Sequence, residues 1–594
     1  MKVPAILTIQ ELRKKYANGE LTPGDVIDEI IRRAKADEQY NIWITPPSNG
    51  RIQKYLDALD EMDLEDYPLW GIPFAVKDNI DVHGWPTTAA CPDYQYAPEE
   101  HASVVQRLVA AGAIPVGKCN LDQFATGLVG MRSPFGETCN SLRGELISGG
   151  SSSGSAVAVA RGQAAFALGT DTAGSGRVPA ALNRLVGLKP SLGAWPTRGV
   201  VPACASLDCV TVFGHTLADA LAVDAAVRGV DERDPWSRHV PPPALKLPAQ
   251  LCLPRGPLRF FGPYEAAYRK AWHTAVTRIE SMGLPVKYVD IGIFTEAAKI
   301  LYDGPWVAER WSGLGSFVED HPDSLLPVTE RILRSGASAS WTASSLFQAT
   351  HQLQRYKLEA RKLLQDSVLV MPTCGGTWTR QQVRDEPFHT NSEMGIYTNH
   401  CNLLDLCAIA VPADDADIDL PFGITMFGLS EQEGLMIAAA DKFSDPNRIF
   451  ELNHINADNT VEIAVCGLHM RGYPLEAQML EHGALFVKEA KTAPRYALVK
   501  LTGSLEKPGL IKRSSSGEAA GSASIELEIW EMPARQLGRF LSLIPAPLSL
   551  GKIELEDHSE VIGFLCEAYA AETAEDISHL GAWKKASPII NEVN

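Results

Sequence analysis

Short apolar segments and helical segments alternate along the first 440 or so residues of this 594-residue chain. Residues 72–82 and 111–120 are apolar, contain β-branched residues and are bounded by glycine and proline, a pattern typical of buried strands. Residues 101–112, between them, have helical spacing and end at a glycine. Strands that are apolar on both faces need helices on both sides. We therefore predict an α/β domain over residues 1–440, with a sheet covered by helices.

The sequence changes character after residue 440. Residues 441–460 are polar and rich in turn-forming residues, so we expect a linker there. Several strand-like segments follow, and residues 524–532 alternate inward-facing and outward-facing residues. These features predict a second, smaller α+β domain over residues 461–594. Within it, residues 506–524 are expected to form a loop.

The composition limits the possible partners. The formal net charge is −18, from 54 Lys and Arg against 72 Asp and Glu. An acidic chain is a poor match for nucleic acid or for an anionic membrane. The N-terminal residues form an amphipathic pattern without the apolar core of a signal peptide, and no stretch is long and apolar enough to span a membrane. The 11 cysteines include no Cys-x-x-Cys pair, so we expect reduced thiols, no metal site and a cytoplasmic protein.

Residues 148–180 hold two serine clusters flanked by glycine, and Ser151 and Ser175 are the candidate nucleophiles. A phosphate-binding P-loop does not fit, because no lysine follows the glycines. Gly150–Gly154 satisfies the G-x-S-x-G pattern of a nucleophile elbow, but no apolar strand precedes it. A purely structural turn into a helix also accounts for the first cluster.

Lys77 ends the apolar run that begins at Phe74. A lysine in that position either reaches solvent or has a function. If it is desolvated, its pKa falls from about 10.4, and the neutral amine can act as a base near pH 7. A protein kinase is excluded because no H-R-D or D-F-G motif follows.

Lys77, residues 149–160 (GGSSSGSAVAVA) and residues 169–180 (GTDTAGSGRVPA) together resemble the amidase signature family. The resemblance implies a mixed β-sheet core covered by helices and a Ser–cisSer–Lys triad. Ser175 would be the nucleophile, Ser151 the bridging serine after a cis peptide bond, and Lys77 the base. Such a triad needs no histidine, metal or cofactor.

The same motif predicts an oxyanion hole. Its glycines allow the backbone to approach a substrate closely, so backbone N–H groups can face the developing oxyanion. The residues that would supply these donors are Thr172, Ala173, Gly174 and Ser175.

Residues 299–311 carry Tyr302 and Arg310 on either side of a Gly-Pro pair. An arginine fork matches a carboxylate, although a surface arginine and a core tyrosine are an equally simple explanation. This segment, with residues 200–210 and 397–412, is similar to the allophanate hydrolases, which hydrolyse urea-1-carboxylate in ATP-dependent urea degradation. That resemblance assigns Tyr302 and Arg310 to binding the substrate carboxylate, with the Gly127 backbone nearby.

Residues 465–501 resemble the C-terminal domain of the same enzymes, which has a gamma-glutamylcyclotransferase-like fold. The resemblance implies that the first domain releases ammonia. The second domain would assist decarboxylation of the N-carboxycarbamate that remains, with His469 in a catalytic role. A lone histidine after a strand is also a common structural residue. The resemblance further implies a homodimer and a urea carboxylase supplied by another chain.

Two alternatives stay open on the sequence alone. The chain could be an amidase for another small carboxylated or aliphatic amide, with its C-terminal domain serving as a docking or dimerisation module. It could also be a glutaminase-like subunit of a tRNA amidotransferase, but such a subunit has no use for residues 461–594.

Overall fold

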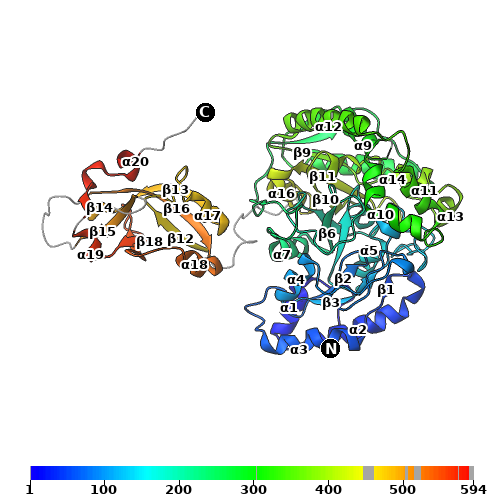
Figure 1. The fold of residues 1–594 in the computed structure, drawn as a ribbon, viewed down its shortest axis with the longest axis horizontal. Helices are drawn as coiled ribbons and strands as arrows, with labels where there is room; N and C mark the ends of the chain where they lie inside the picture. The colour runs from blue at the N-terminus through cyan, green and yellow to red at the C-terminus, as the bar shows by residue number, and fades with distance from the viewer. Residues whose placement is uncertain are drawn as a thin grey trace. The chain divides into compact units, whose positions relative to one another are not determined.

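The computed structural model describes residues 2–302, 304–445, 460–501, 506–513, 523–572 and 574–587. The chain forms two compact units, Met1–Phe450 and Glu451–Asn594 (Figure 1). Each unit has its own hydrophobic core. Among the described helices, none combines the length and apolar character that crossing a bilayer requires.

The first unit is built on one mixed sheet, which has eleven strands within the described residues, in the order β1-β3-β2-β4-β6-β5-β10-β11-β9-β7-β8. The central strands β2 to β6 are buried along their whole length, which explains their continuous apolar sequences. Strand β2 pairs in parallel with β3 and β4, whereas β4 pairs antiparallel with β6. The strands are β1 (Trp43–Thr45), β2 (Pro73–Lys77), β3 (Ile114–Cys119), β4 (Phe166–Asp171), β5 (Val186–Lys189), β6 (Cys209–Gly214), β7 (Gln250–Pro254), β8 (Val286–Val289), β9 (Ser367–Pro372), β10 (Leu406–Pro412) and β11 (Gly423–Leu429).

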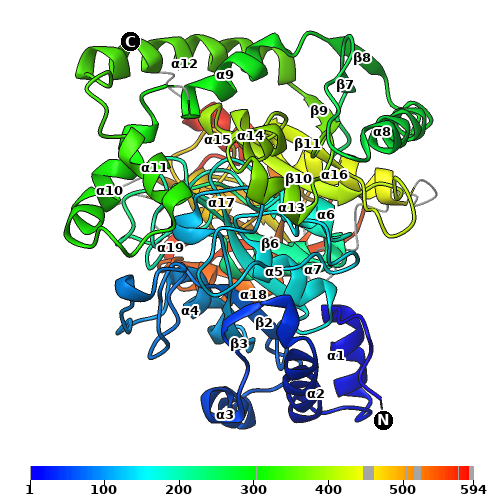
Figure 2. The same ribbon diagram turned by 90° about the vertical axis from the view of Figure 1, so that its right-hand side faces the viewer.

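Helices cover this sheet. At one end α9 and α12 lie near β9, and at the other α1 to α3 lie near β1 and β3 (Figure 1). Figure 2 shows α8 beside β7 and the edge strand β8. The helices are α1 (Ile9–Ala17), α2 (Pro23–Ala36), α3 (Asn49–Ala58), α4 (Ser103–Ala110), α5 (Ser153–Ala160), α6 (Val178–Leu182), α7 (Leu217–Val227), α8 (Glu265–Glu280), α9 (Gly292–Tyr302), α10 (Val307–Asp320), α11 (Pro327–Ser335), α12 (Ala343–Leu364), α13 (Arg380–Asp385), α14 (His389–Met394), α15 (His400–Leu403) and α16 (Glu433–Ser444).

Helix α5 explains why the segment after the first serine cluster consists of small residues. Seven of its eight residues are buried. A Cβ at Gly154 would collide with the carbonyl of Ile42, so only glycine fits there. The small side chains let α5 pack closely against strands β2 and β4, and this places the serine turn at its N-terminus beside the end of β2.

The predicted α/β class is confirmed in the first unit. The two strands expected near residues 72–82 and 111–120 are β2 and β3, and the helix between them is α4. Helix α16 continues to Ser444, and its last four residues lie within the expected linker of residues 441–460. Residues 446–459 of the linker lie outside the described residues.

The second unit is an α+β fold with two sheets in its described part, of five strands (β13-β16-β12-β18-β17) and three strands (β15-β14-β19). The loop expected at residues 506–524 contains β15, which pairs with β14, and residues 514–522 lie outside the described ranges. The elements are β12 (Thr460–Val465), α17 (Glu476–Glu481), β13 (Leu485–Lys491), β14 (Tyr496–Leu501), β15 (Lys507–Lys512), β16 (Glu526–Pro533), α18 (Ala534–Leu541), β17 (Leu548–Glu554), β18 (Glu560–Cys566), α19 (Ala568–Ala571), β19 (Glu575–Asp576) and α20 (Trp583–Ala586).

Candidate active site

Lys77 is the last residue of β2, and its side chain is completely buried. Its Nζ atom donates hydrogen bonds to Ser151 Oγ and to Thr170 Oγ1, each at 2.7 Å. Thr170 lies on β4, the parallel neighbour of β2. Two of the three predicted triad residues, Lys77 and Ser151, are therefore in direct contact. Lys77 does not reach solvent, which was the alternative that the sequence left open.

The environment of Lys77 lowers its pKa from 10.5 to about 7. The main cause is burial, which disfavours the charged ammonium. The carboxylates of Asp122, Asp208 and Asp171 oppose this effect but do not cancel it. A substantial fraction of Lys77 is consequently a neutral amine near pH 7, as a proton-accepting base requires.

Ser151 lies in the turn before α5, and the Gly150–Ser151 peptide bond is cis. Two backbone hydrogen bonds hold this turn: Gly150 N–H donates to Leu128 O at 2.9 Å, and Asp122 N–H donates to Ser151 O at 3.0 Å. A Cβ at Gly150 would collide with the Asp122 carboxylate, which explains the glycine at this position.

Ser175 lies on the loop between β4 and α6, five residues after Thr170. It is 4% exposed. The Asp171 carboxylate shapes the loop, because it accepts the N–H groups of Gly174 at 2.7 Å and of Gly176 at 3.0 Å and pairs with the buried Arg177. These hydrogen bonds and this ion pair fix the backbone on both sides of the candidate nucleophile.

The loop changes the oxyanion-hole prediction at one residue. The N–H of Gly174 is taken by Asp171, so it is not free to bind an oxyanion. No described residue accepts a hydrogen bond from the N–H groups of Thr172, Ala173 or Ser175. Three of the four predicted donors therefore remain available.

Arg310 on α10 and Tyr302 at the end of α9 lie together. Arg310 Nη2 donates to the Tyr302 hydroxyl at 3.4 Å, and Arg310 Nη1 donates to Thr126 Oγ1 at 3.0 Å. Arg310 is 3% exposed, so it is not the helix-surface arginine that the sequence left open. Gly127 follows Thr126 directly, and the structure thus brings all three predicted substrate-binding residues to one place.

Residues 203–208 connect the Ser175 loop to α10. This connection was not predicted from the sequence. Asp208 accepts the Thr172 hydroxyl at 2.5 Å and the Ala203 N–H at 2.8 Å. Ser206 donates to Glu309, the residue before Arg310, through its N–H at 2.7 Å and its hydroxyl at 2.6 Å. The segment 200–210 was noted only for its resemblance to a family, because partners so distant in sequence leave no local pattern.

His469 follows β12 in the second unit and is 9% exposed. Its Nε2 lies 3.0 Å from Gln478 Oε1 on α17, and its ring stacks on Phe564 with a centroid distance of 5.3 Å. Burial lowers its pKa, which favours the neutral imidazole. Gln478 Oε1 accepts from Nε2 in the tautomer that carries its proton there, and in that tautomer Nδ1 is the basic nitrogen.

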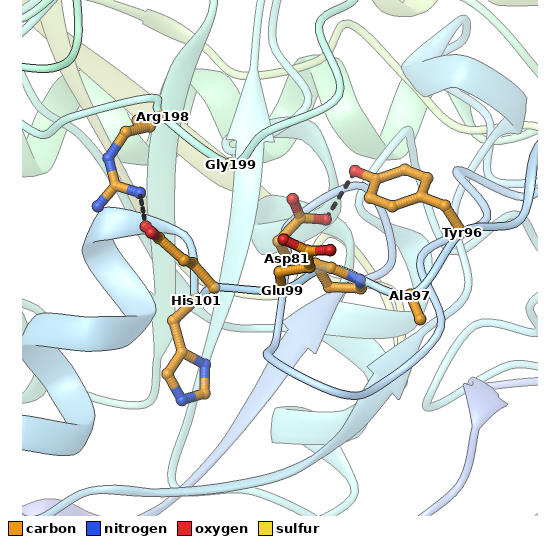
Figure 3. A pocket seen from close by; sticks show the side chains of 9 residues that line it. Asp81, Tyr96, Ala97, Glu99, His101, Arg198 and Gly199 are labelled. Atoms are coloured by element: carbon orange, nitrogen blue, oxygen red, sulfur yellow. Dashed lines mark hydrogen bonds and ion pairs between the residues drawn. The ribbon is translucent and has the colours of Figure 1, made fainter.

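The first unit also has an open pocket of about 370 Å³ that none of the predicted site residues lines. Tyr96 donates its hydroxyl proton to Asp81 at 2.7 Å on one wall, and Arg198 and His101 lie on the other side (Figure 3). This pocket lacks the buried lysine–serine pair and is separate from the candidate active site.

Comparisons with known proteins identify the family of each unit. Residues 25–437 match the Amidase family, and residues 461–587 match the allophanate hydrolase C-terminal domain. Urea amidolyase from Saccharomyces cerevisiae is 39% identical over 576 residues, which cover 92% of this chain and 31% of that protein.

Two solved structures are similar over nearly the whole chain. Allophanate hydrolase from Kluyveromyces lactis is 35% identical with a TM-score of 0.73, and the alignment covers 98% of each chain. Urea amidolyase from the same yeast is 36% identical with a TM-score of 0.73, covering 98% of this chain and 36% of that one. The chain spans about a third of the length of the urea amidolyases. By its fold and its match over residues 25–437, the chain belongs to the Amidase family, and its second unit is an allophanate hydrolase C-terminal domain.

Proposed function

We propose that this chain hydrolyses allophanate (urea-1-carboxylate) to ammonia and carbon dioxide in urea degradation. The observation that carries the proposal is the contact between the buried Lys77 and Ser151, in the same unit as a buried Arg310. The Lys77–Ser151 pair provides the proton relay that amide hydrolysis needs, and the Arg310 guanidinium suits a small amide that bears a carboxylate. The similarity to Kluyveromyces lactis allophanate hydrolase over 98% of each chain supports this substrate.

The reaction begins when Ser175 Oγ attacks the amide carbon of the urea end. Ser151 takes the proton of Ser175 and passes its own to the neutral Lys77. The tetrahedral intermediate then loses ammonia, which receives its proton from Ser151. Water attacks the acyl-enzyme through the same relay and releases N-carboxycarbamate with a free Ser175.

The free backbone N–H groups of Thr172, Ala173 and Ser175 are the proposed oxyanion donors. Removing one such donor typically slows an acyl transfer by about 10²–10³-fold. Because Asp171 holds the neighbouring Gly174 and Gly176 amides, the loop is preorganised before substrate binds.

Arg310 and Tyr302 are proposed to bind the substrate carboxylate, next to the Gly127 backbone. The Arg310 guanidinium donates hydrogen bonds to Thr126 and to the Tyr302 hydroxyl, so little side-chain freedom is lost when a carboxylate binds. A neutral amide would leave the buried guanidinium without a directly paired carboxylate, which disfavours its binding.

The second unit is proposed to assist decarboxylation of N-carboxycarbamate, with the neutral His469 as the proton-handling group. The alternative is that this unit docks a partner or forms the dimer. A full-length His469→Asn variant separates the two roles, because a catalytic His469 predicts release of the first ammonia at the normal rate, with delayed release of carbon dioxide and of the second ammonia. Normal timing of both products would assign His469 a structural role.

Urea carboxylation is proposed to come from a separate urea carboxylase. The relatives named urea amidolyase are about three times as long as this chain, and the K. lactis structure of that name aligns with this chain over 36% of its length. Co-purification from cells expressing both chains tests a physical association. The homodimeric state and the cytoplasmic location remain predictions.

The deciding experiment is ammonia release from freshly prepared allophanate compared with malonamate, biuret and acetamide at one pH. A kcat/KM for allophanate that is higher by orders of magnitude supports the proposal. A flat profile would leave a serine–lysine amidase and would overturn the substrate.

A further inference from the structure

Two buried arginines flank Thr126. Arg310 Nη1 donates to the Thr126 hydroxyl at 3.0 Å, and Arg132 Nη1 donates to the Thr126 carbonyl at 2.8 Å. Each arginine is 3% exposed. No carboxylate in the described part of the chain lies within ion-pair distance of either guanidinium.

Other buried arginines of this unit have partners. Arg177 pairs with Asp171 at 2.9 Å, and Arg228 pairs with Asp224 at 2.7 Å and with Glu433 at 2.5 Å. A buried charge without a counter-charge is costly, and proteins pair such groups unless a ligand supplies the opposite charge. The two arginines beside Thr126 depart from this pattern together.

Arg132 has an unused donor. Its Nη2 donates to Pro387 O at 2.8 Å, whereas its buried Nε has no hydrogen-bond partner among the described residues. Burial lowers the pKa of Arg132, the Asp122 charge opposes this shift, and the charge of Arg310 adds to it. The Asp122 carboxylate itself is occupied by the backbone N–H groups of Gly130 and Arg132.

Arg132 also borders the proposed substrate-binding backbone. A Cβ at Gly127 would lie 3.1 Å from Arg132 Cδ, so the stem of the arginine packs against that glycine. The Gly127 N–H has no acceptor among the residues that the structure describes. Three hydrogen-bond donors therefore lie around Thr126 and Gly127. They are the unused Nε–H of Arg132, the unused N–H of Gly127 and the guanidinium of Arg310.

We propose that Arg132 and Arg310 jointly bind the carboxylate of the substrate, and that Arg132 determines the preference for small carboxylated amides over neutral ones. This inference rests on the proposed function and extends it to a residue for which no role was predicted. A purely structural role is the competing explanation, since Arg132 joins the carbonyls of Thr126 and Pro387. The test must therefore separate charge recognition from loss of structure.

The variants are Arg132→Met, which keeps the apolar stem, and Arg132→Lys, which keeps the charge but not the fork. Arg13→Met is a matched control. Arg13 also donates to two backbone carbonyls, of Tyr67 at 2.7 Å and of Leu64 at 2.9 Å, and it contacts no residue of the site. The Arg13→Met variant therefore shows how the loss of two hydrogen bonds to backbone carbonyls, without any change at the site, affects stability and activity.

The first measurement is kcat/KM for allophanate and for biuret, in which a carboxamide replaces the carboxylate. We expect Arg132→Met to lower the value for allophanate at least about 30-fold more than that for biuret, because a buried charge pair is lost only with the former. Arg132→Lys should fall between Arg132→Met and the wild type, and Arg13→Met should leave the ratio unchanged. An equal loss on both amides, or no loss, would overturn the proposal.

The second measurement does not depend on turnover. Calorimetry on Ser175→Ala protein compares binding of malonamate with that of its neutral analogue malonamide, with and without Arg132→Met. We expect about a tenfold or greater loss of affinity for malonamate alone. If the wild type does not hydrolyse allophanate, the proposed function fails, whereas this binding comparison still tests the arginine pair.

A crystal structure of Ser175→Ala protein with malonamate covers the case in which Arg132→Met does not fold. A carboxylate oxygen within about 3.2 Å of Arg132 Nε supports the proposal. A carboxylate bound by Arg310 alone, with Arg132 Nε facing elsewhere, would refute it.

Discussion

Ser206 and Glu309 are joined by two hydrogen bonds, from the Ser206 N–H at 2.7 Å and from its hydroxyl at 2.6 Å to the Glu309 carboxylate. Glu309 precedes Arg310 on α10, and Ser206 lies two residues before Asp208, which holds the Thr172 hydroxyl. The segment carrying the candidate nucleophile and the helix carrying the candidate carboxylate ligand are thus connected through one short loop.

Glu309→Gln should weaken this connection without removing a group that touches substrate. Hydrogen bonds to a charged group contribute about 1.5–3 kcal/mol, so we expect kcat/KM for allophanate to fall about tenfold, mainly through KM. The value for biuret should change less than about twofold, because biuret does not need Arg310. Ser206→Ala removes only the hydroxyl bond and should cause a smaller loss in the same direction. Equal losses on both amides would show that the loop only maintains the fold.

The pH dependence of kcat/KM should follow Lys77. Its pKa is lowered to about 7, mainly by burial, and the neutral form is the base. Activity should therefore rise with pH through about 7 and level off above it, and it should fall as the ammonium forms below 7. Initial rates from pH 5.5 to 9 at substrate concentrations well below KM test this. A profile that still rises at pH 9 would mean that Lys77 keeps its ordinary pKa of 10.5.

Ser175→Ala should abolish turnover while the protein folds normally. The Ser175 hydroxyl makes no hydrogen bond to another described residue, so its removal leaves the hydrogen bonds and the ion pair of Asp171 intact. We expect a melting temperature within a few degrees of the wild type and ammonia release at the background rate. Residual turnover above about 1% of the wild-type rate would assign the nucleophile elsewhere.

The sequence predicted the residues that stand in characteristic local motifs. Lys77 ends an apolar strand, and the two serine clusters lie in glycine-rich turns, so both were visible without a structure. The prediction was less accurate where a side chain of the same motif takes up a backbone donor: Asp171, three residues before Gly174, accepts the Gly174 N–H, which removes one of the four expected oxyanion donors.

Residues whose roles depend on long-range contacts were not predicted. Arg132 lies 178 residues before Arg310, and the two arginines come together only in the folded chain, where both donate to Thr126. The loop expected near residues 506–524 contains strand β15, because pairing with β14 outweighs a turn-rich local sequence.

Arg310→Ala should cost about 2–5 kcal/mol in transition-state binding with allophanate, the usual loss when a buried charge is deprived of its partner. Acetamide, which carries no carboxylate, should be affected much less. The measurement is kcat/KM for both substrates at one pH. Equal losses would make Arg310 a structural residue that supports Thr126 and Tyr302.

Gly127→Ala tests how tightly the carboxylate pocket is built. A Cβ at Gly127 would lie 2.6 Å from Asp122 Oδ2 and 3.1 Å from Arg132 Cδ, so either the carboxylate or the arginine must move. Overpacking of this kind costs about 1–3 kcal/mol of stability, and displacement of Arg132 should lower kcat/KM for allophanate more than for biuret. Gly144→Ala is the matched control, because nothing lies within 4 Å of a Cβ at Gly144. Unchanged stability and an unchanged substrate preference in Gly127→Ala would mean that the loop can relax, and that the close packing of Gly127 against Arg132 does not control specificity.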